Sequence, residues 1–241
     1  MTGEKNGGII PVMEAYDAVA RDYAAVFDRI ELRTFEWPWI RNLVARERPR
    51  SVLDLGCGNG YLSGALAGMA PDICALEPSP VMCSIARKNL DGAVLLRQGA
   101  AESIPFGDRR FDMVISLLSF RYMVWDRALD EIRRVLKSGG VFILADLFAG
   151  SFNPLYLHRY AASWAAARIH CVRDREYYKK LRALTGSERW RTMLGEHPKR
   201  SAACARKAVA EQFHIERIQL LSAALRGSTV GFVCRNRTLS G

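Results

Sequence analysis

The chain has 241 residues, of which 49% are apolar and 25% charged, and its formal net charge is +10. This length lies in the range of single α/β domains and is enough to bury a core without disulfide bonds or metals. No apolar run approaches the roughly 18 residues of a membrane span, and the polar start Met1–Gly8 lacks the apolar segment of a secretory signal. We therefore expect a cytoplasmic protein.

The cysteines and the charges limit which metal sites, disulfide bonds and binding partners we expect for this chain. Six cysteines are scattered along the chain without any C-x-x-C pair, so we expect neither a metal site nor a disulfide framework. Residues 1–150 hold 18 Lys and Arg against 19 Asp and Glu, whereas residues 151–241 hold 17 against 6. A positive field attracts anionic partners. A solvated basic surface would have the same composition, so both interpretations stay open.

The first fifty residues are expected to form a helical N-terminal cap, 1–50. Apolar side chains recur at helical spacing over 15–30 and again over 35–46, and Pro49 marks the boundary that follows. Beyond it, short apolar runs alternate with amphipathic helices, which indicates a parallel sheet covered on both faces. The strands are predicted at 52–55, 73–76, 94–96, 111–117 and 141–147, and the helices at 61–69, 81–89 and 127–136.

This alternating core, 51–147, gives way to a different pattern. The helix over 127–136 is expected to end at the cap Gly139-Gly140. Residues 150–212 are basic, aromatic and mostly helical, and we expect them to form a lid. Two further strands, 215–221 and 229–235, surround Arg226-Gly227-Ser228 and predict a terminal strand pair over 213–237. All of these parts belong to one domain, 1–241.

A glycine loop follows the first predicted strand as Asp54-Leu-Gly56-Cys-Gly58-Asn-Gly60. In sheets of this kind ligands bind at such a loop, and glycines let the backbone approach them closely. A dinucleotide loop requires G-x-G-x-x-G, but Tyr61 occupies the sixth place here. Asp54 would also repel a pyrophosphate. The loop therefore favours a cationic ligand, S-adenosylmethionine, over NAD.

Glu77 ends the second predicted strand, where a carboxylate can accept hydrogen bonds from ribose hydroxyls. NAD enzymes use the same feature, so the glycine spacing decides between the two cofactors. Asp54 and Glu77 would have no such role if they only capped local turns.

Five motifs in order resemble the class I S-adenosylmethionine-dependent methyltransferases, in particular the ubiquinone and natural-product small-molecule branch. They are Val52-Leu-Asp-Leu-Gly-Cys-Gly-Asn-Gly, Leu76-Glu-Pro-Ser, Gly99-Ala-Ala-Glu-Ser-Ile-Pro-Phe, Phe111-Asp-Met-Val-Ile-Ser and Arg134-Val-Leu-Lys-Ser-Gly-Gly-Val-Phe. The resemblance implies a Rossmann-like α/β fold with a seven-stranded, mostly parallel sheet whose last strand is antiparallel.

The resemblance also implies a set of cofactor-binding positions. Asp54, Gly56 and Gly58, with Cys57 between them, would hold the methionine portion, and Glu77 with Pro78 the ribose. Ala100, Ala101 and Glu102 would border the adenine. Ser116 and Leu117 would pass beneath the sulfonium, and Tyr16 and Tyr23 would close over the cofactor.

Two departures from the family pattern affect the site. Ala100 stands where relatives often carry an Asp that accepts the adenine amino group, so adenine recognition would depend on backbone groups or Glu102. Phe120-Arg121-Tyr122 replaces a His pair found in relatives after the fourth strand, which removes a general base from that place.

The acceptor is the least determined part of the function. Arg121 and Tyr122 are expected to face it, and His158 or His197 in the lid are candidate general bases, although exposed histidines are common. We expect the basic lid to cover an acidic small molecule or to dock an acidic carrier protein that holds one. A methyltransferase acting on RNA and an inactive cofactor-binding partner protein are the alternatives; no appended RNA-binding module is visible in the sequence.

Overall fold

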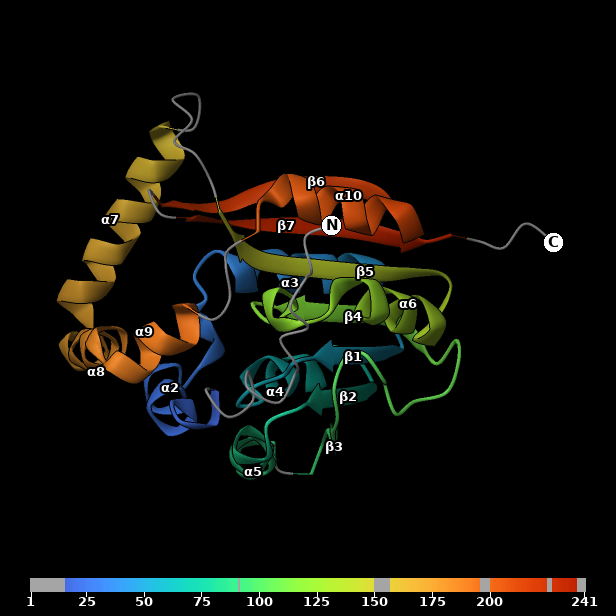
Figure 1. Cartoon of the computed structure of the whole chain (residues 1–241), viewed down its shortest axis with the longest axis horizontal. Coiled ribbons are helices and arrows are strands. Elements are labelled where there is room, and N and C mark those ends of the chain that lie inside the picture. Colours follow the sequence, from blue (N-terminus) through green and yellow to red (C-terminus); the bar gives the residue numbers. More distant parts are fainter. Residues whose placement is uncertain (1–15, 91, 150–156, 196–199, 225–226, 238–241) are drawn as a thin grey trace, which may run out of the picture.

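The computed structural model describes residues 16–90, 92–149, 157–195, 200–224 and 227–237. Its strands form one seven-stranded sheet in the order β3-β2-β1-β4-β5-β7-β6 (Figure 1). The strands are β1 Ser51–Leu55, β2 Asp72–Glu77, β3 Leu95–Gln98, β4 Phe111–Leu117, β5 Leu136–Phe148, β6 Phe213–Ala224 and β7 Gly227–Asn236.

The direction of the strands confirms the predicted Rossmann-like α/β fold. Strands β1 to β5 pair in parallel, whereas β7 runs antiparallel to both β5 and β6. Strand β1 is buried along its whole length, as expected for a parallel strand with helices on both faces. The carboxyl ends of β1, β2 and β4 therefore meet at one edge of the sheet, where ligands bind in folds of this type.

Helices cover the sheet on both faces. They are α2 Ala20–Val26, η1 Ile30–Leu32, α3 Glu36–Glu47, α4 Tyr61–Ala67, α5 Pro80–Asn89, η2 Phe120–Tyr122, α6 Trp125–Val135, α7 Leu157–Arg173, α8 Arg175–Gly186, α9 Glu188–Gly195 and α10 Ala202–Gln212.

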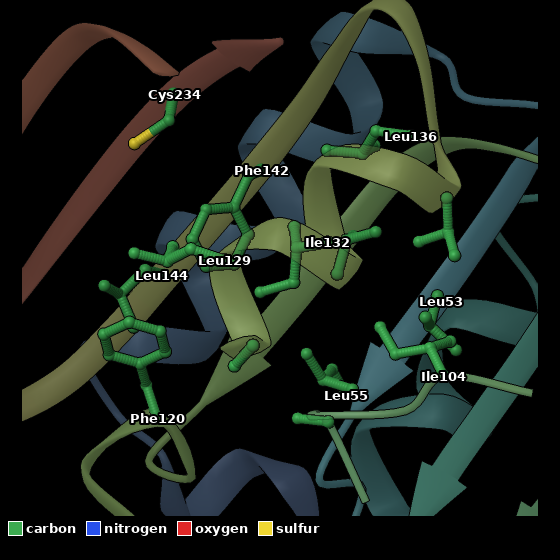
Figure 2. Close-up of a cluster of buried hydrophobic side chains, with 14 of the residues drawn as sticks. Leu53, Leu55, Ile104, Phe120, Leu129, Ile132, Leu136, Phe142, Leu144 and Cys234 are labelled. Atoms are coloured by element: carbon green, nitrogen blue, oxygen red, sulfur yellow. The ribbon is translucent and has the colours of Figure 1, made fainter. Parts of the chain in front are cut away.

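Two apolar clusters fill the space between the sheet and its helices. Figure 2 shows part of the cluster beneath α6, where Leu129 and Ile132 lie over Phe142 and Leu53. The cluster on the opposite face joins Ile40 and Leu43 of α3 to the sheet. A third, smaller cluster packs α8 and α9 against α2, so the segment after β5 lies next to the N-terminal helices. Two distant parts of the sequence thus meet at the same end of the molecule.

Two predicted boundaries are wrong, each because of a contact with a distant part of the chain. Strand β5, expected over 141–147, begins at Leu136, which pairs with Phe111 of β4 directly after α6 ends at Val135; Gly139, with φ +70°, lies in a register shift of that strand instead of capping a helix. The helix expected over 15–30 is interrupted after Val26. The backbone turns away at Phe27, whose carbonyl accepts a hydrogen bond of 2.6 Å from Asn59 of the glycine loop.

Candidate active site

The glycine loop leaves β1 in a conformation that requires glycine. Gly56, Gly58 and Gly60 all have positive φ, between 56° and 86°, a region that costs other residues about 1 kcal/mol or more. A Cβ on Gly56 would lie 2.5 Å from the Cβ of Ser119, whereas a Cβ on Gly58 would meet nothing within 4 Å. Gly56 is therefore required by packing, and Gly58 leaves open space beside the loop.

Asp54 is the penultimate residue of β1, directly before this loop, and is almost completely buried. The Ser63 hydroxyl of α4 donates a hydrogen bond of 2.5 Å to its carboxylate. Burial raises the pKa of Asp54 to about 7, because the charged form loses its hydration. A cationic ligand beside this group would favour the ionised carboxylate.

Glu77 ends the neighbouring strand β2 and faces the same space. Its carboxylate accepts hydrogen bonds from the backbone N–H groups of Gly58, at 2.8 Å, and Ser79, at 3.0 Å. Burial raises the pKa of Glu77 to about 7 in spite of these bonds. Ser79 in turn caps α5 and donates to Asp17, which ties the segment before α2 to this end of the sheet.

An aromatic roof, made of Tyr16, Tyr23, Phe27, Tyr177 and Trp190, lies over the glycine loop. Tyr23 stacks on Trp190 of α9 with ring centroids 6.1 Å apart, and Phe27 meets Tyr177 of α8 edge to face. The Tyr16 ring touches both Tyr23 and Tyr122. The roof thus combines the N-terminal segment with the lid helices.

Two arginines of the N-terminal segment reach the site. Arg33 donates a hydrogen bond of 2.6 Å to the Tyr23 hydroxyl, and its guanidinium lies 4.0 Å from the centroid of the Phe27 ring. Among the described residues it forms no ion pair. Arg29 is instead bound to Asp174 of the lid at 2.5 Å. Arg33 is therefore a positive charge available to a ligand.

One cavity of about 1150 Å³, a volume that includes its open mouth, is lined by both carboxylates, both arginines and three rings of the roof, those of Tyr16, Tyr23 and Phe27. Every residue expected to bind the cofactor lines it except Ser116, which is fully buried and hydrogen-bonded to Ser119 at 2.8 Å. Sequence reasoning missed several lining residues. They include Phe27, Arg29, Ile30, Arg33, Asn59, Tyr61, Leu118, Ser119 and Met123.

Some of these residues could have been predicted from their positions in the sequence. Asn59 and Tyr61 belong to the glycine loop and the helix start after it, so their adjacency to the expected site was visible. Arg33 and Ser119 had no such signal, because only the chain turns after Phe27 and Leu118 bring them to the cavity. Glu102 lines the cavity, but one of its oxygens already accepts the backbone N–H of Val124 at 2.6 Å.

Of the residues expected to bind the acceptor or to act as its general base, only some line the cavity. Tyr122 lines the cavity, but Arg121 does not; its guanidinium pairs at 2.8 Å with the buried carboxylate of Asp146. His158 is exposed on α7 and does not line the cavity. His197 lies outside the described residues. Among the described residues no group of three potential metal ligands occurs.

Comparisons with known proteins show the family to which the chain belongs. The family profile described as a methyltransferase domain matches residues 53–144. The chain is 33% identical over 159 residues to a demethylmenaquinone methyltransferase of Thermotoga maritima, covering 60% of this chain and 68% of that protein. It is 34% identical over 171 residues to a malonyl-[acyl-carrier protein] O-methyltransferase of Geobacter sulfurreducens, covering 67% and 59%.

Solved structures match over nearly the whole chain. A chain in the complex of the Haloferax volcanii Trm112 methyltransferase activator with a methyltransferase has a TM-score of 0.65 at 22% identity, covering 95% of this chain and 99% of that one. At this identity the likeness shows the fold. Together with the relatives, it places the chain in the class I S-adenosylmethionine-dependent methyltransferase family. None of the described helices has the length and apolar character to span a membrane.

Proposed function

We propose that the protein transfers a methyl group from S-adenosylmethionine to an acidic small molecule, either free or bound to a carrier protein. The distribution of charge in the cavity is the observation that carries this proposal. Two buried carboxylates, Asp54 and Glu77, lie at the ends of β1 and β2, whereas Arg33 belongs to the N-terminal segment that forms the roof. A cationic cofactor and an anionic acceptor would suit these two sides.

The residues fit the cofactor in charge and shape. Asp54 and Glu77 have pKa values raised to about 7, so a nearby ammonium or sulfonium would hold them in the ionised form. The open space at Gly58 lets a ligand approach the backbone. Glu77 would accept hydrogen bonds from ribose hydroxyls while Gly58 and Ser79 hold its position. Ala100, Ala101 and Glu102 would border the adenine.

In the mechanism that we infer, the protein mainly aligns the acceptor with the methyl group and removes water from both. S-adenosylmethionine supplies a methyl group that its sulfonium already activates. The aromatic roof would exclude water, and the cavity would align the acceptor with the methyl group, which lowers the entropic part of the barrier. Burial raises the pKa of Tyr16 and Tyr122, so both hydroxyls remain protonated and can donate hydrogen bonds to an anion.

An acceptor carboxylate suits these groups better than an alcohol does. It is already ionised at neutral pH and requires no general base, whereas an alcohol benefits from one. Arg33 would bind it with a charge-assisted hydrogen bond, and Tyr122 would donate a second one. The Geobacter relative, named as an O-methyltransferase of malonyl-[acyl-carrier protein], supports an acidic, carrier-bound acceptor; the Thermotoga relative supports a small molecule of another kind.

The proposal is tested by methyl incorporation from radiolabelled S-adenosylmethionine. The acceptors are malonyl-acyl carrier protein, demethylmenaquinone, a panel of free carboxylic acids, and bulk tRNA. We expect label in an acid and none in tRNA. Label in tRNA alone would establish the RNA alternative. Failure to bind S-adenosylhomocysteine in calorimetry would contradict the enzyme interpretation altogether.

A further inference from the structure

Helix α7 exposes three large apolar side chains to solvent. Leu157 is 61% exposed, Trp164 65% and Ile169 52%. Single exposed apolar residues are common, but several gathered on one element mark an interaction surface. Figure 1 shows α7 along one side of the molecule, away from the centre of the sheet.

These side chains form a continuous face, which we call the α7 stripe. Residues three, four and seven positions apart share one side of a helix, and the exposed members follow that spacing. The stripe consists of Leu157, Ala161, Trp164, Ala165, Arg168 and Ile169. A different side of α7 is attached to the protein: the Ser163 hydroxyl accepts the backbone N–H of Ala223 in β6 at 3.1 Å. The packed side and the stripe are thus distinct.

The segment that carries the stripe has an excess of positive charge. Residues 157–195 contain nine Lys and Arg but only three Asp and Glu. Arg168 lies over the Trp164 ring, 5.1 Å from its centroid, and Lys179 and Lys180 of the adjoining helix α8 are exposed. One of the three acids, Asp174, is neutralised by Arg29. The surface therefore combines protruding apolar groups with a net positive field.

We propose that the α7 stripe docks on an anionic lipid surface. A helix with Trp and Leu on one side and basic residues around it binds in the headgroup region, where the apolar groups insert and the cations meet phosphates. The charge disfavours a second copy of this chain as the occupant, since two such lids would repel.

The test is cosedimentation of the full chain with vesicles of phosphatidylcholine and phosphatidylglycerol in equal amounts, and with vesicles of phosphatidylcholine alone. In 50 mM NaCl we expect binding to the anionic vesicles and little to the neutral ones, with release in 500 mM NaCl. Trp164→Ala should raise the lipid concentration needed for half-binding about tenfold. The double variant K179E/K180E should raise it at least as much.

Leu95→Ala is the matched control, because Leu95 is 49% exposed on β3 at the opposite edge of the sheet. It should bind vesicles like the unmodified chain, and all variants should keep their affinity for S-adenosylhomocysteine. Three results would overturn the proposal: no binding to anionic vesicles, equal losses in Trp164→Ala and Leu95→Ala, or docking of an acidic carrier protein through the stripe without any vesicle binding. Because these readouts require no turnover, they are independent of the proposed acceptor.

Discussion

Gly58 and Glu77 are joined by a hydrogen bond of 2.8 Å from the backbone N–H of the glycine loop to the carboxylate at the end of β2. The carboxylate thereby holds the loop while its other oxygen holds Ser79 at the start of α5. One acidic side chain thus fixes two segments that border the cavity. Any change in the charge of Glu77 or of the neighbouring Asp54 is expected to alter both ligand binding and stability.

The contribution of Asp54 to the stability of the free protein should fall as the pH rises from about 4 to 7. Burial raises the pKa of Asp54 from its ordinary value to about 7, so in this range the folded state binds more protons than the unfolded state. The free energy of unfolding then falls, by at most about 1.4 kcal/mol per pH unit for this group. Asp54→Asn should flatten the decline, as measured by urea unfolding at pH 5 and pH 7.5. If the free energy of unfolding changed by the same amount between pH 5 and pH 7.5 in both proteins, this prediction would be contradicted.

Cofactor affinity should show the opposite dependence on pH. Ionised Asp54 and Glu77 attract a cation, and protonation near pH 7 removes that attraction. The affinity for S-adenosylmethionine should therefore tighten from pH 6 to pH 8. Asp54→Ala should weaken binding about tenfold or more at pH 8 and remove much of the pH dependence. Calorimetry measures both effects, and an unchanged affinity would refute the assigned role of Asp54.

Two glycine substitutions should separate packing from ligand access. Gly56→Ala forces a Cβ to within 2.5 Å of Ser119 at φ +75°, so we expect a loss of about 2–4 kcal/mol in the free energy of unfolding. Gly58→Ala strains the backbone but meets nothing within 4 Å. It should cost about 1 kcal/mol and mainly weaken cofactor binding. Equal stability losses in the two variants would show that this geometry does not govern the loop.

Arg33→Gln should raise the KM for an acidic acceptor by about 30-fold, the effect of losing a charged hydrogen bond of about 2 kcal/mol. The affinity for S-adenosylhomocysteine should stay the same. Arg29→Gln is the control, since Arg29 lines the same cavity but is held by Asp174. If Arg33→Gln weakened S-adenosylhomocysteine binding and left the KM unchanged, Arg33 would belong to the cofactor side of the cavity.

Asp146→Ala should destabilise the fold by about 3–5 kcal/mol, because it leaves the largely buried Arg121 guanidinium without its partner. Asp130→Ala breaks an exposed pair with Arg133 and should cost less than about 1 kcal/mol. Chemical unfolding measures both. If Asp146→Ala were as stable as the unmodified protein and raised the acceptor KM instead, the expected role of Arg121 in substrate binding would be supported.

The sequence by itself determined the fold class and the residues at the strand ends that border the cavity. Asp54 and Glu77 lie near the carboxyl ends of β1 and β2 and the glycine loop follows β1; parallel strands bring their carboxyl ends to one edge whatever the rest of the chain does. Local spacing therefore sufficed to predict which residues would gather there. The start of β5 and the end of the N-terminal helix were beyond it, because strand pairing at Leu136 and the bond from Asn59 to Phe27 override local signals.

Only the tertiary structure decided which residues form the roof of the cavity. Arg33 reaches the cavity because the chain turns after Phe27, and Trp190 joins the aromatic roof by stacking on Tyr23 because α9 packs on α2. Arg121, which follows β4 as expected, is drawn away by a carboxylate 25 residues later that is buried in β5. These contacts join residues far apart in the chain, and no local pattern encodes them. The physical reason is that periodicity records which side of its own element a residue occupies, whereas packing between elements selects its neighbours.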